Sequence, residues 1–267
     1  NYSCTHCQSF NNYAFKGHQR WDDYKDEYEL LSKKLDIGII QLMGGEPTLN
    51  PDFNKWLKGI SNLWPTAKLQ ISTNGSTLNK LTQDVYDVLS KNNGTLWITC
   101  HDIKLYDGFL DFINTFLDVI VSDTGEAPAR RVSRIFIDKN GVEVILDWSQ
   151  TFRASAMDLV NKQLTLGYDS DVDEAHDVCG FKTCHQLNKG KLYKCPLVSV
   201  LPDFLNQFNV AVADKELAHA YQPMSHDDDV EKFVNNLVNP IPQCKFCPSN
   251  YNIGHDFIGT DKKVKQT

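Results

Sequence analysis

The sequence lacks two features that would place the protein at a membrane or on duplex nucleic acid. No apolar run approaches the roughly 20 residues that a transmembrane helix needs, and nothing resembles a charged and then apolar secretory leader. The 27 Lys and Arg residues are outnumbered by 34 Asp and Glu residues, giving a formal net charge of −7. Because anionic membranes and duplex nucleic acid bind basic surfaces, we expect neither as a partner.

Cysteine is plentiful, and its distribution is uneven. Seven of the eight cysteines lie toward the two ends of the chain, and we expect the eighth, Cys100, to be a buried and inert thiol. A chain of 267 residues with 41% hydrophobic residues buries a sizeable core without cross-links. We therefore interpret the bunched thiols as metal ligands in a reducing, cytoplasmic compartment, with disulfides as the less favoured alternative.

The N-terminal part of the chain alternates between strand and helix patterns. Short apolar runs predict strands at 37–43, 68–73, 95–100 and 119–121, and amphipathic spacing predicts helices at 21–35, 50–63, 78–89 and 106–117. A hairpin is predicted within 135–147, around the turn residues Asp138 to Gly141. Repeated strand-then-helix units predict an α/β fold with a parallel sheet covered by helices, either open or bent into a barrel.

Composition changes near Leu166, where an acidic, turn-rich stretch begins. We place the domain boundary there, with domains at 1–166 and 167–267. In the second domain, 185–193 is predicted to form a β-hairpin that holds Cys184 and Cys195 near each other. A helix over 227–238 then leads to Cys244-x-x-Cys247.

Polar residues follow the predicted strands where they end. Gly44-Gly45-Glu46-Pro47 follows the first strand, Ser72-Thr73-Asn74 ends the second, and His101 follows the third. The carboxyl ends of parallel strands meet at one face of a β/α barrel, and active sites lie at that face. Cys4 and Cys7 precede the first strand, so we expect them at the same face.

The thiols alone do not choose between metals, because zinc and iron–sulfur clusters both favour soft sulfur ligands. Cys4-x-x-Cys7 alone could be half of a zinc knuckle, and Cys244-x-x-Cys247 with two upstream cysteines could be a zinc ribbon. Glu46 alone could be a surface carboxylate, and Asn74 part of a plain turn. The residues alone therefore leave zinc and iron–sulfur open, and the resemblance that follows implies iron–sulfur.

With these features together, the chain resembles the radical S-adenosylmethionine (SAM) superfamily. Ser3 to Cys7 resembles the latter part of the signature Cys-x-x-x-Cys-x-x-Cys, whose first cysteine would fall immediately before Asn1. The resemblance implies a partial (β/α)6 TIM-like barrel, with Cys4 and Cys7 as ligands of a 4Fe-4S cluster that leaves one iron for S-adenosylmethionine. It also implies a set of cofactor-binding residues, which are Gly44, Gly45, Glu46, Pro47, Ser72, Thr73, Asn74 and the weaker candidates His101 and His6.

The C-terminal part resembles the twitch domain, a shortened relative of the SPASM extension that holds an auxiliary cluster. The resemblance implies a small β-hairpin and helix domain with a second 4Fe-4S cluster. The ligands expected for it are Cys184, Cys195, Cys244 and Cys247, with Cys179 as the rival of Cys184.

The resemblance also implies an activity. We expect an oxidoreductase-type enzyme that cleaves S-adenosylmethionine to a 5′-deoxyadenosyl radical and takes hydrogen from a small polar substrate, such as a sugar, cyclitol or nucleotide derivative. The outcome would be a net oxidation, an epimerisation or a rearrangement, with a reductant such as flavodoxin or ferredoxin as partner. A peptide substrate is the alternative within the family. The alternative of another class is a non-catalytic zinc or iron–sulfur binding module.

Overall fold

The computed structural model describes most of the chain, which divides into two compact units. The described residues are 7, 10, 17–116, 120–122, 131–149, 151–152, 157–160, 163–166, 168–208, 211–212, 214–250 and 255–256. The first unit, here called the sheet unit, comprises His18–Lys25 and Leu35–Thr151; the second, the thiol unit, comprises Asn1–Gly17, Asp26–Lys34 and Phe152–Thr267. This division reflects packing, and the domain boundary near Leu166 stays a prediction.

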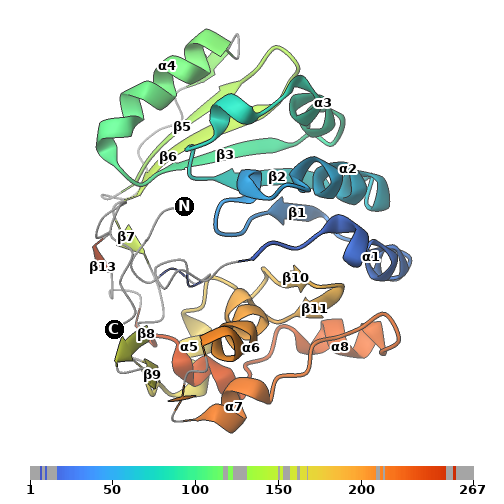
Figure 1. The fold of residues 1–267 in the computed structure, drawn as a ribbon, viewed down its shortest axis with the longest axis vertical. Coiled ribbons are helices and arrows are strands. Elements are labelled where there is room, and N and C mark those ends of the chain that lie inside the picture. The colour runs from blue at the N-terminus through green and yellow to red at the C-terminus, as the bar shows by residue number, and fades with distance from the viewer. Residues whose placement is uncertain are drawn as a thin grey trace. The chain divides into compact units, whose positions relative to one another are not determined.

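A six-stranded sheet with the order β1-β2-β3-β6-β5-β4 forms the centre of the sheet unit (Figure 1). Its strands are β1 (Ile39–Leu42), β2 (Lys68–Thr73), β3 (Thr95–Cys100), β4 (Ile120–Ser122), β5 (Arg131–Ile137) and β6 (Glu143–Ser149). The pairs β1–β2, β2–β3 and β3–β6 are parallel, whereas β5 runs antiparallel to both of its neighbours. The expected α/β fold with a mostly parallel sheet is confirmed, and so is the hairpin, which joins β5 to β6.

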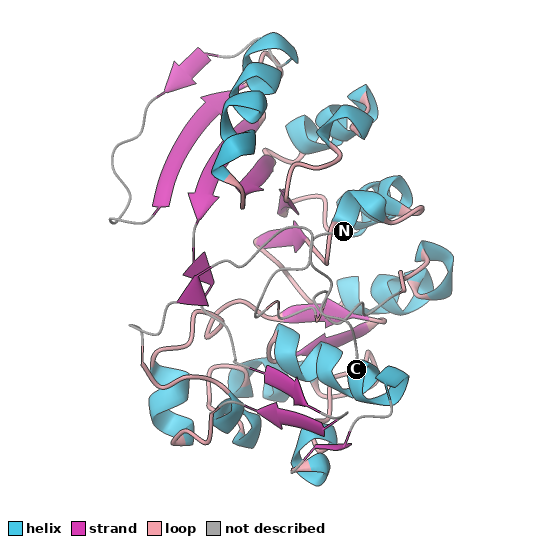
Figure 2. Ribbon diagram, turned by 60° about the vertical axis from the view of Figure 1, so that its left-hand side comes forward, coloured by secondary structure: helices cyan, strands magenta, loops and turns pink. Residues whose placement is uncertain are grey.

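The α-helices of the sheet unit lie along one face of this sheet (Figures 1 and 2). The helices of the sheet unit are α2 (Phe53–Leu63), α3 (Gln83–Lys91), α4 (Tyr106–Phe116) and the 3-10 turns η2 (Trp21–Asp23), η3 (Pro47–Leu49), η4 (Leu78–Lys80) and η5 (Ile103–Leu105). Side chains of β2 alternate between buried and half-buried, and Leu69 and Ile71 are fully buried. No helix in the described part of the chain is long and apolar enough to cross a membrane.

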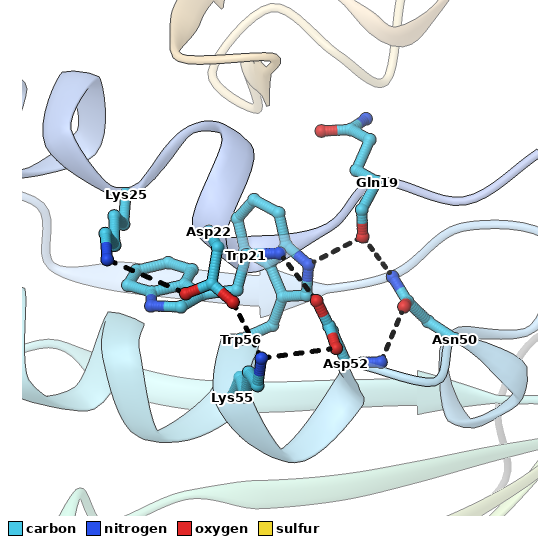
Figure 3. A network of polar contacts seen from close by, with 8 residues as sticks. All are labelled: Gln19, Trp21, Asp22, Lys25, Asn50, Asp52, Lys55 and Trp56. Carbon is cyan, nitrogen blue, oxygen red and sulfur yellow. Dashed lines mark hydrogen bonds and ion pairs between the residues drawn. The ribbon is translucent and has the colours of Figure 1, made fainter.

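Gln19 and Trp21 are hydrogen-bonded to residues at the start of α2 (Figure 3). The carbonyl of Gln19 accepts hydrogen bonds from Asn50 Nδ2 and Trp56 Nε1, each at 3.0 Å. The backbone N–H of Trp21 donates to Asp52 Oδ2 at 3.1 Å, and its ring meets that of Trp56 edge-on. These contacts hold Trp21–Asp23 in a 3-10 turn, so the first α-helix begins later than the predicted residue 21.

The thiol unit is built from short elements around its own core. Its helices are α1 (Lys25–Ser32), whose first residue belongs to the sheet unit, α5 (Val172–Asp177), α6 (Pro196–Phe208), α7 (Lys215–His219), α8 (Val230–Asn236) and η6 (Pro242–Phe246). Its strands are β8 (Met157–Val160), β9 (Gln163–Leu166), β10 (Gln186–Asn188), β11 (Lys191–Tyr193) and β12 (Ala211–Val212), and β13 (His255–Asp256) pairs with β7 (Thr151–Phe152) at the unit boundary.

The predicted hairpin before Cys195 is confirmed. Strands β10 and β11 pair antiparallel, and Lys189 and Gly190 form the turn with φ angles of 49° and 70°. Both angles are positive, as in the two-residue turns that match the twist of a hairpin. This turn fixes the register of β11 and hence the position of Cys195, which follows it.

Close backbone packing at Gly94, between α3 and β3, predicts that a larger residue there destabilises the fold. A Cβ at Gly94 would lie 2.8 Å from the carbonyl oxygen of Leu69 and 2.7 Å from the Leu89 side chain. We expect Gly94→Ala to lower the free energy of unfolding by about 1–3 kcal/mol, because the backbone of β2 cannot yield without losing strand pairing. Urea unfolding followed by circular dichroism measures the effect.

Gly108 is the matched control, since it is exposed in α4 and a Cβ there meets nothing within 4 Å. Gly108→Ala is expected to stabilise the protein by about 0.5–1 kcal/mol through helix propensity. Equal effects of the two substitutions would contradict the packing described at Gly94.

Candidate functional site

Glu46 joins the ends of two neighbouring strands in the sheet unit. Glu46 follows β1 and is 7% exposed. Its carboxylate accepts hydrogen bonds from the residue that ends β2 and from the residue that follows β2. Thr73 Oγ1 donates to Oε1 at 2.8 Å, and the backbone N–H of Asn74 donates to Oε2 at 2.8 Å. Two of the predicted strand-end motifs are therefore in direct contact.

Two further threonines complete the surroundings of this carboxylate. Thr48 Oγ1 donates to Glu46 Oε1 at 2.6 Å and is also hydrogen-bonded to the Thr77 hydroxyl. The sequence analysis did not single out Thr48 or Thr77. The signal that was available was their position, with Thr48 directly after Gly-Gly-Glu-Pro and Thr77 two residues after Ser-Thr-Asn-Gly.

The glycines before Glu46 leave room for a ligand. Gly44 and Gly45 are exposed, and a Cβ at Gly44 would meet no heavy atom within 4 Å. A backbone without side chains beside a fixed carboxylate suits the close approach of a ligand amino group. The residues present thus fit the methionyl end of S-adenosylmethionine.

The remaining strand-end residues lie in the same unit. Ser72 Oγ accepts a hydrogen bond from Gln41 Nε2 at 2.8 Å, which connects β2 to β1. Asn74 is 8% exposed, and its Oδ1 accepts from the backbone N–H of Ser76 at 3.0 Å. His101 follows β3, and burial lowers the pKa of its imidazole to about 4, so the ring is neutral at physiological pH. Cys100 is fully buried, as expected.

The N-terminal thiols belong to the thiol unit. Cys4 and His6 lie outside the described residues, whereas Cys7 is half-buried. The carbonyl of Cys7 accepts a hydrogen bond from the backbone N–H of Phe10 at 2.9 Å. Phe10 is fully buried and stacks on Phe204 of α6, with ring centroids 4.2 Å apart. This aromatic contact fixes Phe10, three residues after Cys7, against α6.

Three local structures bring four C-terminal thiols toward one another. Cys179 follows α5, Cys195 directly precedes α6, Cys244 lies in η6, and Cys247 is the residue after η6. Helix α5 lies against η6, and the Ser170 N–H donates to the Lys245 carbonyl at 3.0 Å. Cys195 and Cys247 both pack against the hydrophobic cluster that contains Phe10.

The electrostatics of these thiols agree with this grouping. Burial first of all, and then the nearby Cys179 and Cys244, raise the pKa of the Cys195 thiol to about 11. Cys247 has its pKa raised by burial and then by the other three thiols. At Cys195, the backbone N–H groups of Leu197 and Val198 act in the opposite direction, because they favour a thiolate at the N-terminus of α6. The donor chemistry fits a metal cluster held by thiolates.

Cys184 is placed differently from the other predicted ligands. It is exposed, and within the described residues it is absent from the electrostatic interactions that connect the other four thiols. Cys179 is half-buried, so the two rivals differ in exposure, and the choice between them as a ligand stays a prediction. Across the described residues, no group of three or more His, Cys, Asp or Glu side chains is arranged around a single metal ion.

Lys194, which the sequence analysis did not single out, lies among these thiols. It is 3% exposed, and Cys244, Cys179 and Cys195 all interact with its charge. Burial is the largest influence on its ammonium and lowers its pKa. The signal available in the sequence was only its position directly before Cys195.

The chain is similar to known proteins over part of its length. Residues 1–103 match the Radical SAM superfamily model. The chain is 29% identical to the GTP 3′,8-cyclase of Nautilia profundicola over 89 residues, which are 33% of this chain and 28% of that protein. It is 23% identical to the GTP 3′,8-cyclase of Aliarcobacter butzleri over 133 residues, 49% of this chain and 35% of that protein.

The matched segments span about a third of the length of these curated relatives. The superfamily match over residues 1–103 includes the Gly-Gly-Glu-Pro strand end. Together, the match and the relatives identify a Radical SAM superfamily domain in the N-terminal region of the chain.

Proposed function

We propose that the protein cleaves S-adenosylmethionine reductively and abstracts a hydrogen atom from a small polar substrate. The observation that carries the proposal is the Glu46 carboxylate, fixed by Thr73 and Asn74 at the ends of two parallel strands within the superfamily match. When bound and reduced, S-adenosylmethionine and a 4Fe-4S cluster supply a 5′-deoxyadenosyl radical. A flavodoxin- or ferredoxin-type reductant is the partner that this chemistry needs.

The residues of the strand ends have separate tasks in this proposal. Glu46 receives the methionyl amino group of S-adenosylmethionine, because a buried carboxylate gives a strong charge-assisted hydrogen bond to an ammonium. Ser72 and Asn74 contact its carboxylate or ribose, and the neutral ring of His101 offers one donor and one acceptor in the same region. Cys4 and Cys7 are two of the three ligands of the cluster, and a third cysteine is expected before Asn1.

A polar sheet face supports a small polar substrate. On the face opposite the buried Leu69 and Ile71, half-buried residues of β1 to β3 pair in register, for example Gln41 with Gln70. This alternate face also carries Ser72, Thr99 and the buried Asp147, whose carboxylate accepts from the Trp97 indole. Amide, hydroxyl and carboxylate groups match the hydroxyls of a sugar, cyclitol or nucleotide.

Among these classes we favour a nucleotide derivative, because both named relatives are GTP 3′,8-cyclases. The net reaction is then an oxidation, epimerisation or rearrangement of the sugar part. A peptide substrate is the alternative within the superfamily.

We further propose a twitch-like second site in which Cys179, Cys195, Cys244 and Cys247 hold an auxiliary 4Fe-4S cluster. The mutual influence of these four thiols supports this ligand set. The four thiolates of such a cluster bind four different irons and lie further apart than the ligands of one ion. A cluster with four protein ligands suits electron transfer rather than substrate binding.

Metal content tests the two-cluster proposal directly. Protein prepared without oxygen is expected to hold roughly eight irons and eight sulfides per chain, and to form 5′-deoxyadenosine from S-adenosylmethionine after reduction with dithionite. Roughly four irons would leave only one of the two sites. Zinc without iron, together with no 5′-deoxyadenosine, would support the non-catalytic binding module instead.

A pair of cysteine variants tests the auxiliary ligand set. Cys179→Ala is expected to lower the iron content by about half, because a ligand of one of two clusters is lost. Cys184→Ala, which removes an exposed thiol, is expected to keep all the iron. The opposite result would restore Cys184 as the ligand, and iron analysis with sulfide analysis measures both.

Glu46→Gln tests the cofactor site. Removing the charge is expected to weaken S-adenosylmethionine binding by roughly 10- to 100-fold, since a hydrogen bond to a charged group contributes about 1.5–3 kcal/mol. The matched control is Glu29→Gln in α1, an exposed glutamate that pairs with Lys33. Equilibrium dialysis of cluster-loaded protein measures the affinity, and unchanged binding in Glu46→Gln would refute this role.

A further inference from the structure

The two oxygens of the Glu46 carboxylate differ in the hydrogen bonds that they accept. Oε1 accepts from the hydroxyls of Thr48 and Thr73, at 2.6 and 2.8 Å, and more distantly from the backbone N–H of Thr48 at 3.4 Å. From the residues that the structure describes, Oε2 accepts one hydrogen bond, donated by the backbone N–H of Asn74 at 2.8 Å. Since a carboxylate oxygen has about two acceptor positions, Oε1 is filled, whereas Oε2 keeps a position for a ligand.

The direction of the hydrogen bonds around Oε1 follows from the chemistry of the hydroxyl group, which carries a single hydrogen. Thr48 donates that hydrogen to Glu46, so Thr77 is the donor in the hydrogen bond between the two threonine hydroxyls. Thr73 also donates to Glu46, and its oxygen accepts from the backbone N–H of Gly75 at 3.1 Å. The hydroxyls of Thr77 and Thr48 therefore donate in series toward one carboxylate oxygen.

The hydroxyl series lies in surroundings that hold it in place. Glu46, Thr73 and Thr77 are all buried, so water has little access to replace a missing donor. Thr77 follows the turn at Gly75, which has a φ angle of 80°. The ring of Phe109 fills the space beside this turn, because a Cβ at Gly75 would lie 2.5 Å from its Cζ atom. Thr77 is thus fixed relative to the end of β2.

We propose that Thr48 and Thr77 are positioning residues for S-adenosylmethionine. Their hydroxyls occupy Oε1 of Glu46 and thereby leave Oε2 to receive the methionyl amino group. A carboxylate with one oxygen already filled accepts the ammonium in one orientation rather than two. Hydroxyls bonded in series polarise one another in a buried site, so Thr77 acts on Glu46 through Thr48. This inference rests on the proposed cofactor role of Glu46.

The test measures the affinity of cluster-loaded protein for S-adenosylmethionine by equilibrium dialysis, without a reductant so that the cofactor stays intact. Thr48→Val and Thr77→Val replace a hydroxyl by a methyl group. Each is expected to weaken binding by about 2- to 10-fold, which is the range that corresponds to the net contribution of one hydrogen bond. Thr48→Ser and Thr77→Ser keep the hydroxyl and are expected to bind like the parent.

Thr82→Val is the matched control. Thr82 is exposed directly before α3, and its side chain makes no hydrogen bond to the start of that helix. The same exchange of hydroxyl for methyl is therefore expected to leave the affinity for S-adenosylmethionine unchanged.

A double-mutant cycle shows whether the threonines act through Glu46. In protein that carries Glu46→Gln, the charge that attracts the ammonium is gone, so adding Thr48→Val or Thr77→Val is expected to cost less affinity than in the parent. An equal loss in both backgrounds would contradict the inference, because the threonines would then influence binding independently of the carboxylate.

The remaining outcomes separate this inference from the proposed function. Thr48→Val and Thr77→Val proteins that hold iron and bind S-adenosylmethionine as tightly as the parent would overturn the inference and leave the proposed function standing. Equal losses in the valine and serine variants would make the role of the threonines steric, and the inference would fail. Should Thr77→Val not fold, the two Thr48 variants decide alone. If the parent holds iron and does not bind S-adenosylmethionine, the cofactor site and the inference fall together.

Discussion

A buried carboxylate sets the geometry of the sheet unit's functional edge. Glu46 follows one strand, and it takes hydrogen bonds from the end of the next strand and from the turn that continues its own. A buried carboxylate is costly when its oxygens lack hydrogen-bond partners. Thr73, Asn74 and Thr48, which donate to Glu46, can therefore move only together with it. Strands β1 and β2 pair in parallel, so these hydrogen bonds fix the donors and acceptors at one edge of the sheet.

The thiol unit also contains a buried polar side chain. Lys194 is 3% exposed, and its backbone N–H, its carbonyl and its side-chain nitrogen each have a hydrogen-bond partner. In this unit the hairpin, α5, α6 and η6 contain a cysteine or lie within two residues of one, whereas α1, α7 and α8 do not.

Much of the sheet unit could be predicted from the sequence, because its strands have clear boundaries. Strands β2 and β3 were predicted to the residue, since charged or glycine-containing turns flank short apolar runs. The first helix was predicted to start at Trp21, yet α1 begins at Lys25. Hydrogen bonding of Trp21 to Asp52, 31 residues away, decides that difference, and local periodicity does not contain it.

The C-terminal thiols show where sequence reasoning ends. The hairpin before Cys195 was predictable from its turn, but the choice between Cys179 and Cys184 depends on how α5 lies against η6. Lys194 looks like an ordinary lysine near a strand end in the sequence, and only tertiary packing buries it. Long-range packing, not residue type, carries the information at both positions.

The stacking of Phe10 on Phe204 has a consequence for the order in which the protein is made. The partner ring lies almost 200 positions later in the chain, in a helix whose cluster also includes Phe246. During synthesis, the segment after Cys7 leaves the ribosome long before its packing surface exists, and contacts at such separation form late in folding. Phe10 can therefore take its packed position only after translation has passed Phe204, so the stretch of chain made in between has to fold or wait before this stacking contact forms.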